Sequence, residues 1–429
     1  MKKYFFISSA ILIIGLTMFK LCSASPGARY FPEIKQILSQ HFDKEIDIVS
    51  SVQLSEKERR NLILRIEFKG KTEQLSQTLI FKESVPDVED KDEDDKEIFG
   101  RFCRDWAGLE FMSTEDQAQS ITPRFYGGSV PNRFVLLEDL GQNHISLVDS
   151  LTGYNRQEAE SALTRFVTSL AKFHAFGIGR TDVYAAILKR LNENAETWQE
   201  DYKTQKEEAH QFIIRALNKL EIKAPAAFDE ELDLIFKNSL EPGAFTTLVH
   251  GDICPDNVFD NPVKNKLHII DFEWSVVKNA MLDATYLRMS MPTCWCAKAF
   301  PPTLIDSLEV LYRQELEKNL SKAFDDDVYY NAYTLACGQW ALTAFMNAGG
   351  VLDEDFNMGT GPIPVGNRWN KDANLARPRV LSRLKAFIEV SLKYNKLPEL
   401  RSIAEKVLAK ITERWVDSKP LDLYPVFVD

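Results

Sequence analysis

The chain has 429 residues, 52 of them basic and 63 acidic, and a formal net charge of −11. Its hydrophobic content of 45% is enough for a packed core in one large two-lobed unit or in two or three domains. The negative charge argues against nonspecific binding to nucleic acid or to anionic membranes, whereas it would attract a cationic small molecule.

The six cysteines do not form a recognisable metal or redox motif, because none of them makes a C-x-x-C pair. Cys294 and Cys296 are too close together to chelate one metal ion comfortably, so we interpret both as packing residues. The cysteines lie at positions 22, 103, 254, 294, 296 and 337.

Residues 1–24 are predicted to be an N-terminal export signal or a membrane anchor rather than part of the fold. Lys2 and Lys3 precede the apolar run 4–19, and small residues around Ala24 suit signal cleavage. The run is short for a full span of about 20 residues, which favours an export signal. An uncleaved anchor or a misassigned start codon is the alternative. Any membrane contact is expected through this segment, and the compartment of the remaining chain is left open.

Residues 30–140 are predicted to form a small β-rich lobe that begins with a helix around Ile34 to Leu38. Three strand-like segments follow, at 46–49, 62–68 and 79–82, with alternating or continuous apolar residues. Lys82 therefore falls on the third strand. A helix is expected next, at about 96–112.

Two loops of this lobe are rich in charge. The loop 54–61 contains no glycine, although glycine lets backbone N–H groups approach phosphate closely. Ser55, Arg59 and Asn61 are candidates for phosphate contacts through their side chains, and an ordinary charged turn is the alternative. The acidic run 87–97 is interpreted as a solvated loop, since like charges at that density repel one another.

The pattern becomes helical from about residue 142. Apolar residues recur at helical spacing from Leu163 to Phe173, and Gly177 is expected to end that helix. His174 lies on its core side and is interpreted as a structural histidine. Asp283 is expected to start a helix and to brace the loop with candidate metal ligands that is described below. Asp325 is expected to cap a buried helix.

The C-terminal part contains a candidate substrate loop. Residues 359–379, rich in glycine, proline and asparagine, are either such a loop or a connector. Two amphipathic helices are expected after it, around 381–388 and 403–411.

The stretch 248–274, which reads LVHGDICPDNVFDNPVKNKLHIIDFEW, carries the strongest functional signal. Asp252 can accept or orient the proton of an attacking hydroxyl. Asn257 and Asp271 supply the oxygen ligands that Mg²⁺ prefers. His250 is interpreted as a brace for the loop, because Asp252 stands where the hydroxyl would arrive.

Protein kinases separate the same two residue types by the same distance in H-R-D-L-x-x-x-N. Here Gly251 replaces the arginine, and Asp271-Phe272-Glu273 replaces D-F-G. The combination of H-G-D-x-x-x-x-N with I-D-F-E resembles the aminoglycoside phosphotransferase and choline kinase family.

That resemblance implies an α+β fold, namely a bilobal protein-kinase-like fold with a small β-rich N-lobe at 30–140 and a large, mainly helical C-lobe at 141–429. It also implies use of ATP with Mg²⁺ and a small-molecule hydroxyl as phosphoryl acceptor. The expected roles are Asp252 as catalytic base and Asn257 and Asp271 as metal ligands.

The same resemblance assigns the nucleotide-binding residues. Lys82 would hold the α- and β-phosphates, with Asp105 as its acidic partner and Glu110 as the alternative. Glu138 belongs to 135–141, which resembles the hinge strand whose backbone pairs with adenine, and Gly141 lets the chain turn.

Two other functions are considered. A nucleotide-binding pseudokinase that acts as an interaction module is favoured by the glycine-free loop, by Asp105 in place of the more usual glutamate, and by the export-like N-terminus. A protein kinase of the secretory route is less well supported, because no recognisable activation segment follows Asp271. Aminoglycosides, amino alcohols, sugars and nucleosides all remain open as acceptors.

Overall fold

The computed structural model describes residues 25–55, 61–69, 77–85, 95–115, 120–195, 202–225, 227–241 and 243–428. The expected N-terminal signal, residues 56–60 of the predicted phosphate loop and most of the acidic run lie outside them. Among the described helices, none is long and apolar enough to cross a membrane.

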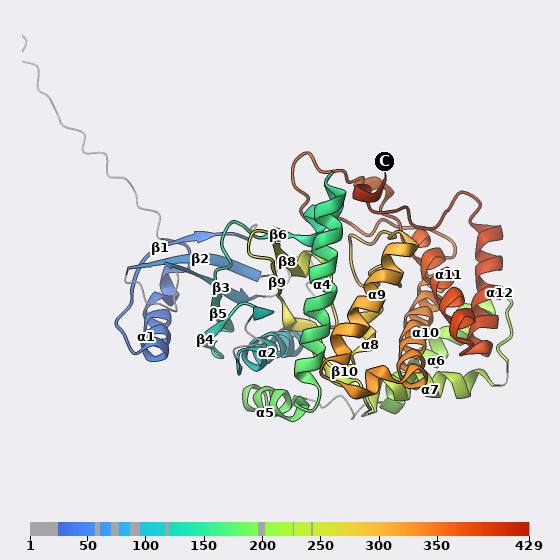
Figure 1. The fold of residues 1–429 in the computed structure, drawn as a ribbon, viewed down its shortest axis with the longest axis horizontal. Helices are drawn as coiled ribbons and strands as arrows, with labels where there is room; N and C mark the ends of the chain where they lie inside the picture. The colour runs from blue at the N-terminus through green and yellow to red at the C-terminus, as the bar shows by residue number, and fades with distance from the viewer. Residues whose placement is uncertain are drawn as a thin grey trace, which may run out of the picture.

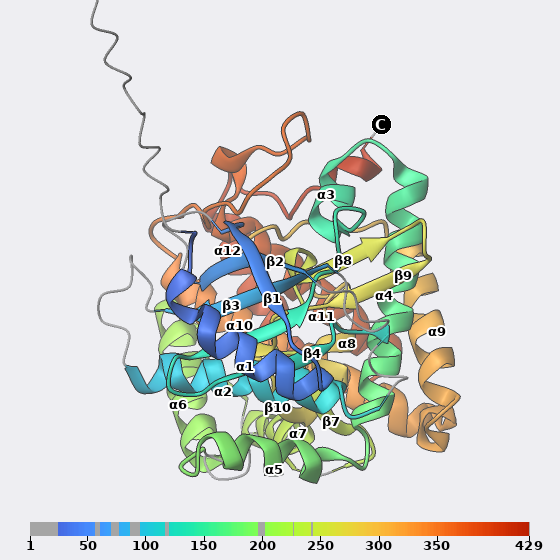
Figure 2. The ribbon, with the colours of Figure 1, turned by 90° about the vertical axis from the view of Figure 1, so that its left-hand side faces the viewer.

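The first lobe is a five-stranded antiparallel sheet in the order β1-β2-β3-β5-β4, with one helix on its outer face (Figures 1 and 2). Its elements are α1 (Phe31–Phe42), β1 (Asp47–Gln53), β2 (Asn61–Lys69), β3 (Thr78–Ser84), β4 (Phe125–Ser129) and β5 (Phe134–Glu138).

Alternation along the strands divides the side chains of this sheet between two cores, because successive residues point to opposite faces. On β5, Phe134 and Leu136 belong to the small core under α1, whereas Val135 and Leu137 belong to the large core shared with the second lobe. On β3, Phe81 faces α1, so Lys82 projects to the opposite face.

Helix α2 (Asp95–Met112) lies where the two lobes meet and agrees with the predicted 96–112 helix. A Cβ atom at Gly108 would lie 2.7 Å from the Cβ of Phe272, so glycine is needed for this close approach. The part of the acidic run that the structure describes is helical, because Asp95 and Glu97 lie in the first turn of α2. Acidic residues there interact favourably with the helix dipole.

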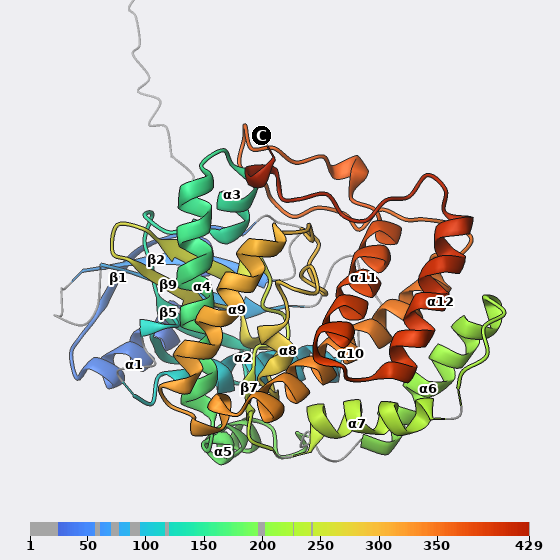
Figure 3. The same cartoon turned by 45° about the vertical axis from the view of Figure 1, so that its right-hand side comes forward.

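The second lobe consists mainly of helices, with α10, α11 and α12 packed side by side at its far end (Figure 3). Its helices are α3 (Leu147–Thr152), α4 (Arg156–Gly177), α5 (Thr181–Leu191), α6 (Tyr202–Lys219), α7 (Phe228–Leu240), α8 (Met281–Ala284), α9 (Pro302–Glu317), α10 (Asp326–Gly350), α11 (Ala376–Tyr394) and α12 (Pro398–Arg414).

Two small antiparallel sheets flank the H-G-D and D-F-E residues, which lie in the connections between their strands. One has the order β6-β8-β9 and the other pairs β10 with β7. Their strands are β6 (Ile145–Ser146), β7 (Thr246–Val249), β8 (Val258–Asn261), β9 (Lys266–Ile269) and β10 (Val276–Asn279).

The helix predictions of this lobe are mostly confirmed. Helix α4 ends at Gly177, and the side chain of Asp325 accepts the N–H of Val328 as the N-cap of α10. The stretch 359–379, predicted to be a substrate loop or a connector, ends earlier than expected, since α11 already begins at Ala376. The chain therefore has the expected two-lobed, kinase-like α+β fold.

Candidate active site

Lys82 connects the sheet of the first lobe with helix α2 and with the D-F-E residues of the second lobe. Its Nζ donates to Asp105 Oδ2 at 2.9 Å and to Asp271 Oδ1 at 2.5 Å. We call these three residues the lysine cluster. Lys82 and Asp105 are only 8% and 2% exposed, so their charges are weakly screened by solvent.

The protonation of the lysine cluster follows from burial and from its carboxylates. Burial by itself lowers the pKa of Lys82, but Asp105, Asp271 and Glu273 together raise it above its ordinary value. Burial acts on Asp105 in the opposite sense and raises the pKa of its carboxyl. We assign a charged Lys82, because three carboxylates act on this single ammonium group.

Glu110, the alternative partner of Lys82, has other contacts. Its Oε2 accepts Trp106 Nε1 at 2.7 Å and Arg190 Nη2 at 2.6 Å. Asp105 also accepts the Phe272 N–H at 2.8 Å through Oδ1. The acid on α2 therefore connects the lysine directly to the residue that follows Asp271.

Asp252 lies in the loop between β7 and β8, and we call residues 250–257 the HGD loop. Asn257 Nδ2 donates to the backbone carbonyl of Asp252 at 3.0 Å and to its Oδ2 at 3.3 Å. The amide group of Asn257 thus holds the Asp252 side chain from within the loop. Its nitrogen is occupied in this way, which leaves the Asn257 side-chain oxygen as the atom suited to a metal.

Asn257 and Asp271 are brought together by the backbone of the two strands. Ile270 directly precedes Asp271, and its N–H donates to the Asn257 carbonyl at 3.0 Å. Asp271 has φ 68° and ψ 69°, a left-handed conformation that aspartate adopts more readily than most residues.

His250 braces this loop, as its position in the motif suggests. Its Nε2 donates to the Ile270 carbonyl at 2.8 Å, and its Nδ1 accepts the Asp252 N–H at 3.3 Å. These two contacts require the neutral imidazole with its proton on Nε2. The imidazole is therefore occupied by the backbone on both sides.

Asp283 braces the HGD loop, which contains the proposed metal ligand Asn257. It lies inside the short helix α8, and its carboxylate accepts the N–H groups of His250 at 2.6 Å and Gly251 at 3.2 Å. His174 is a buried structural histidine, as expected, because its ring contacts Asp283 Oδ2 at 3.3 Å and Tyr312 Oη at 2.8 Å.

Gly251 explains one departure from the protein-kinase motif. Its φ is 78°, and a Cβ atom there would lie 2.4 Å from the carbonyl oxygen of Trp274. An arginine would combine a strained left-handed backbone with a steric clash. The close packing of the HGD loop against the chain after Asp271 therefore requires glycine.

Glu138 ends β5, where the hinge was predicted. Its N–H donates to the Arg124 carbonyl at 2.9 Å, and its side chain accepts the Arg124 N–H at 3.2 Å. Arg124, directly before β4, therefore occupies the backbone donor of Glu138. The sequence did not indicate that neighbouring Asp139 pairs with Arg65 Nε at 2.6 Å.

The predicted phosphate loop is described only at its ends. Ser55 Oγ accepts the Ile63 N–H at 3.1 Å, so this hydroxyl is engaged with the next strand. Asn61 begins β2, and Arg59 lies outside the described residues.

A disulfide corrects our interpretation of Cys294 as a packing residue. Cys254, inside the HGD loop, is bonded to Cys294 across a sequence separation of 40 residues. Cys296 is a buried free cysteine, as expected for a packing residue. The pairing was missed because residues so far apart in sequence give no local signal.

Two buried arginines of α11 hold the chain around Cys294, and we call residues 289–296 the opposing segment. Arg379 donates to the carbonyls of Cys294 and Trp295, each at 2.5 Å, and Arg383 donates to that of Pro292 at 2.7 Å. Burial lowers the pKa of Arg379 to about 10 and that of Arg383 to about 9, so both remain protonated at neutral pH.

The residues of the site fit Mg²⁺ and nucleotide phosphates chemically. The Asn257 amide oxygen and the Asp271 carboxylate are hard oxygen ligands beside the ends of the paired strands β8 and β9. Such a pair suits an ion that keeps most of its coordination for water and phosphate. A buried, charged lysine fixed by two carboxylates beside them suits a phosphate group.

This two-lobed fold, with its lysine cluster and HGD loop, defines a kinase-like protein. The model of the ecdysteroid kinase-like family matches residues 61–323, and the chain belongs to that family. Among curated proteins, no sequence matches it significantly.

Solved structures of similar fold include three whose sequences are each 13% identical to this chain. A choline kinase from Cryptosporidium parvum Iowa II has a TM-score of 0.45, with 89% of this chain and 96% of that chain covered. The GDP complex of aminoglycoside 2'-phosphotransferase-IIIa has a TM-score of 0.41, with 85% and 99% covered. A choline kinase from Streptococcus pneumoniae has a TM-score of 0.39, with 83% and 98% covered.

Proposed function

We propose that this protein transfers the γ-phosphoryl group of ATP to a hydroxyl of a small molecule. The observation that carries the proposal is the double contact of Lys82 with Asp105 and Asp271. It brings a strand lysine, a helix acid and the D-F-E aspartate together from three distant parts of the sequence. Membership in a kinase-like family supports the same chemistry.

The proposed roles follow from the chemistry of each group. Asp252 accepts the proton of the acceptor hydroxyl as its oxygen attacks phosphorus, and Lys82 offsets negative charge on the phosphates. Asn257 and Asp271 would hold Mg²⁺, which neutralises phosphate charge when bound. Such catalysis depends mainly on positioning and electrostatics, so loss of one group should reduce turnover far more than folding.

The family name makes a hydroxylated steroid the first acceptor to test. Cationic hydroxyl compounds form a second group, because the net charge of −11 would attract them. ATP turnover should be measured with a panel of acceptors that contains both classes together with sugars and nucleosides. A true acceptor raises turnover above the rate of hydrolysis by water.

Two aspartate variants test the assignment of roles. Asp271→Asn should weaken binding of Mg-ATP and lower turnover, since it removes a charge that would hold the metal. Asp252→Asn should leave Mg-ATP affinity nearly intact and reduce phosphoryl transfer by about 10²-fold or more. Calorimetric titration with Mg-ATP measures binding, and slow ATP hydrolysis measures turnover without a known acceptor.

The exposed Asp372 provides a matched control, because Asp372→Asn should change neither measurement. A parent protein that binds no Mg-ATP would contradict the kinase proposal. Binding without Asp252-dependent turnover, across the full acceptor panel, would favour the pseudokinase alternative.

A further inference from the structure

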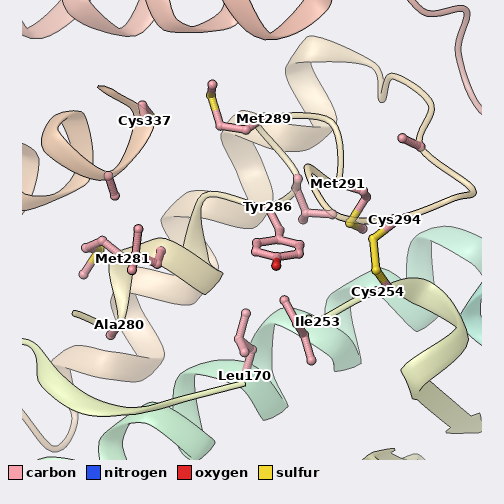
Figure 4. Close-up of a cluster of buried hydrophobic side chains, with 14 of the residues drawn as sticks. Leu170, Ile253, Cys254, Ala280, Met281, Tyr286, Met289, Met291, Cys294 and Cys337 are labelled. Carbon is pink, nitrogen blue, oxygen red and sulfur yellow. A yellow bond between two sulfur atoms is a disulfide. The ribbon is translucent and has the colours of Figure 1, made fainter. Parts of the chain in front are cut away.

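The disulfide lies directly beside the proposed catalytic base. Cys254 is two residues after Asp252, and its Sγ lies 3.0 Å from Asp252 Oδ1. The two sulfur atoms and a carboxylate oxygen of Asp252 all lie within 4.8 Å of one another. Figure 4 shows the bond joining the loop of Cys254 to the chain of Cys294, beside Ile253, Tyr286 and Met291.

The residue before Cys294 contacts the same carboxylate. Thr293 Oγ1 donates to Asp252 Oδ1 at 2.5 Å, while Asn257 Nδ2 lies 3.3 Å from Oδ2. Both carboxylate oxygens are therefore held, one from within the HGD loop and one from the opposing segment. Tyr286 Oη adds a third link, because it donates to the Gly251 carbonyl at 2.8 Å and lies 3.2 Å from Thr293 Oγ1.

Without the covalent bond, the contact from Thr293 would be weak. Thr293 is exposed, so water competes for its hydroxyl, and a single exposed hydrogen bond contributes little net free energy. Cys294, in contrast, is 1% exposed and Cys254 3% exposed. The buried bond fixes the backbone next to Thr293 and holds its hydroxyl against Asp252.

We propose that the Cys254–Cys294 disulfide positions Asp252 for catalysis by holding Thr293 against its carboxylate. This inference rests on the proposed role of Asp252. Thr293 and the two cysteines are positioning residues in it. The bond acts as a structural brace, and its loss lowers turnover. An oxidising compartment, which the proposed export signal would provide, lets such a bond persist.

The opposing segment should remain folded without the disulfide. Arg379 and Arg383 hold its carbonyls from α11, and Trp295 Nε1 donates to Asp256 Oδ2 at 2.7 Å. Loss of the sulfur–sulfur bond should therefore loosen Asp252 and Thr293 locally. Turnover can then be compared between folded proteins.

A double variant without the bond provides the main test. Cys254→Ala with Cys294→Ala should lower kcat for ATP turnover at least about tenfold, because small displacements of reacting groups strongly reduce rate. Its Kd for Mg-ATP should change less than kcat does, since the lysine cluster is untouched and, of the groups proposed to hold Mg-ATP, only Asn257 lies in the loosened HGD loop. Cys337→Ala, a buried free cysteine of α10, is the matched control and should retain parent kcat.

Chemical reduction tests the same bond in the parent protein. A water-soluble phosphine converts the disulfide to two thiols, while the phosphine takes oxygen from water to become its oxide. Turnover should fall after treatment and return after reoxidation, and the double variant should respond to neither step.

Thr293→Val should also lower kcat with unchanged Mg-ATP affinity, because it removes the hydroxyl. Thr293→Ser keeps the hydroxyl and should retain the parent kcat.

Two results would overturn the inference: peptide mapping that finds Cys254 and Cys294 as free thiols in the oxidised parent, or a double variant with parent kcat. Failure of the proposed function is separate, because an oxidised parent would then show no Asp252-dependent turnover. In that case hydrogen exchange still decides whether the disulfide fixes the loop. Amides of residues 250–257 should exchange faster in the double variant, and unchanged exchange would contradict the brace.

Discussion

The lysine cluster and the surroundings of Asp252 are held by different kinds of contact. Lys82, Asp105 and Asp271 meet through buried charge, and each lies on or next to a regular strand or helix. Asp252 lies in a loop, held by an amide, a threonine and a disulfide, and the opposing segment is fixed to α11 through backbone carbonyls. Removing charge should damage the first region, whereas removing tethers should damage the second.

The largest effect on stability is expected for Asp105→Ala in the lysine cluster. Loss of one partner from a buried ion pair costs about 3–5 kcal/mol, because the other charge remains buried. Mg-ATP affinity should fall as well, since Lys82 loses the acid that positions it. Denaturant unfolding and calorimetric titration measure the two effects.

Glu110→Ala is the matched control on the same helix. Glu110 contacts Trp106 and the largely exposed Arg190, and exposed pairs contribute about 0–1 kcal/mol. Equal and small losses in the two variants would leave the assignment of Lys82 without support.

A smaller loss of stability, with a different functional signature, is expected for Arg383→Met. The substitution removes the charged donor to the part-buried Pro292 carbonyl, and a hydrogen bond from a charged group contributes about 1.5–3 kcal/mol. Turnover should fall because the opposing segment moves relative to Asp252, while Mg-ATP affinity should be retained.

Arg414→Met on α12 is the control for that prediction. Arg414 is half exposed and pairs with the exposed Asp353, so its loss should change neither unfolding nor turnover. A loss of Mg-ATP affinity in Arg383→Met would show that the two regions are not separable.

The smallest effect is expected at Asp139, which ties the chain after β5 to Arg65 of β2. Burial alone raises the pKa of Asp139, but hydrogen bonds from Arg65, Thr78 and the Gly141 N–H bring it below its ordinary value. Asp139→Asn should cost about 1 kcal/mol of unfolding free energy at neutral pH, the usual net value of a hydrogen bond.

That loss should depend on pH in one direction. Because the folded-state pKa lies below that of the unfolded chain, the unfolded chain binds the proton first as pH falls. The stabilisation by Asp139 is therefore complete above the ordinary aspartate pKa of about 4 and disappears as pH falls through the lower folded value. Unfolding of parent and variant between neutral and acidic pH should show the difference shrink, and a growing difference would contradict the assignment.

The sequence by itself determined the elements that depend on local pattern. Apolar periodicity predicted α1, α4 and the strand that carries Lys82, because helices and strands bury one face at fixed spacing. The motif of Asp252, Asn257 and Asp271 was recognisable because all three lie within the short stretch 248–274. Part of the lysine cluster came from a family resemblance, since the pairing with Asp105 crosses from a strand to a helix.

Only the tertiary structure decided what surrounds Asp252. The Cys254–Cys294 bond, the Thr293 contact and the carbonyls held by Arg379 and Arg383 join residues about 40 to 90 positions apart. Such contacts have no period along the chain, and an arginine that binds backbone carbonyls looks in sequence like any charged helix residue. These contacts form only when α11 packs against the opposing segment, and local propensity does not specify that packing.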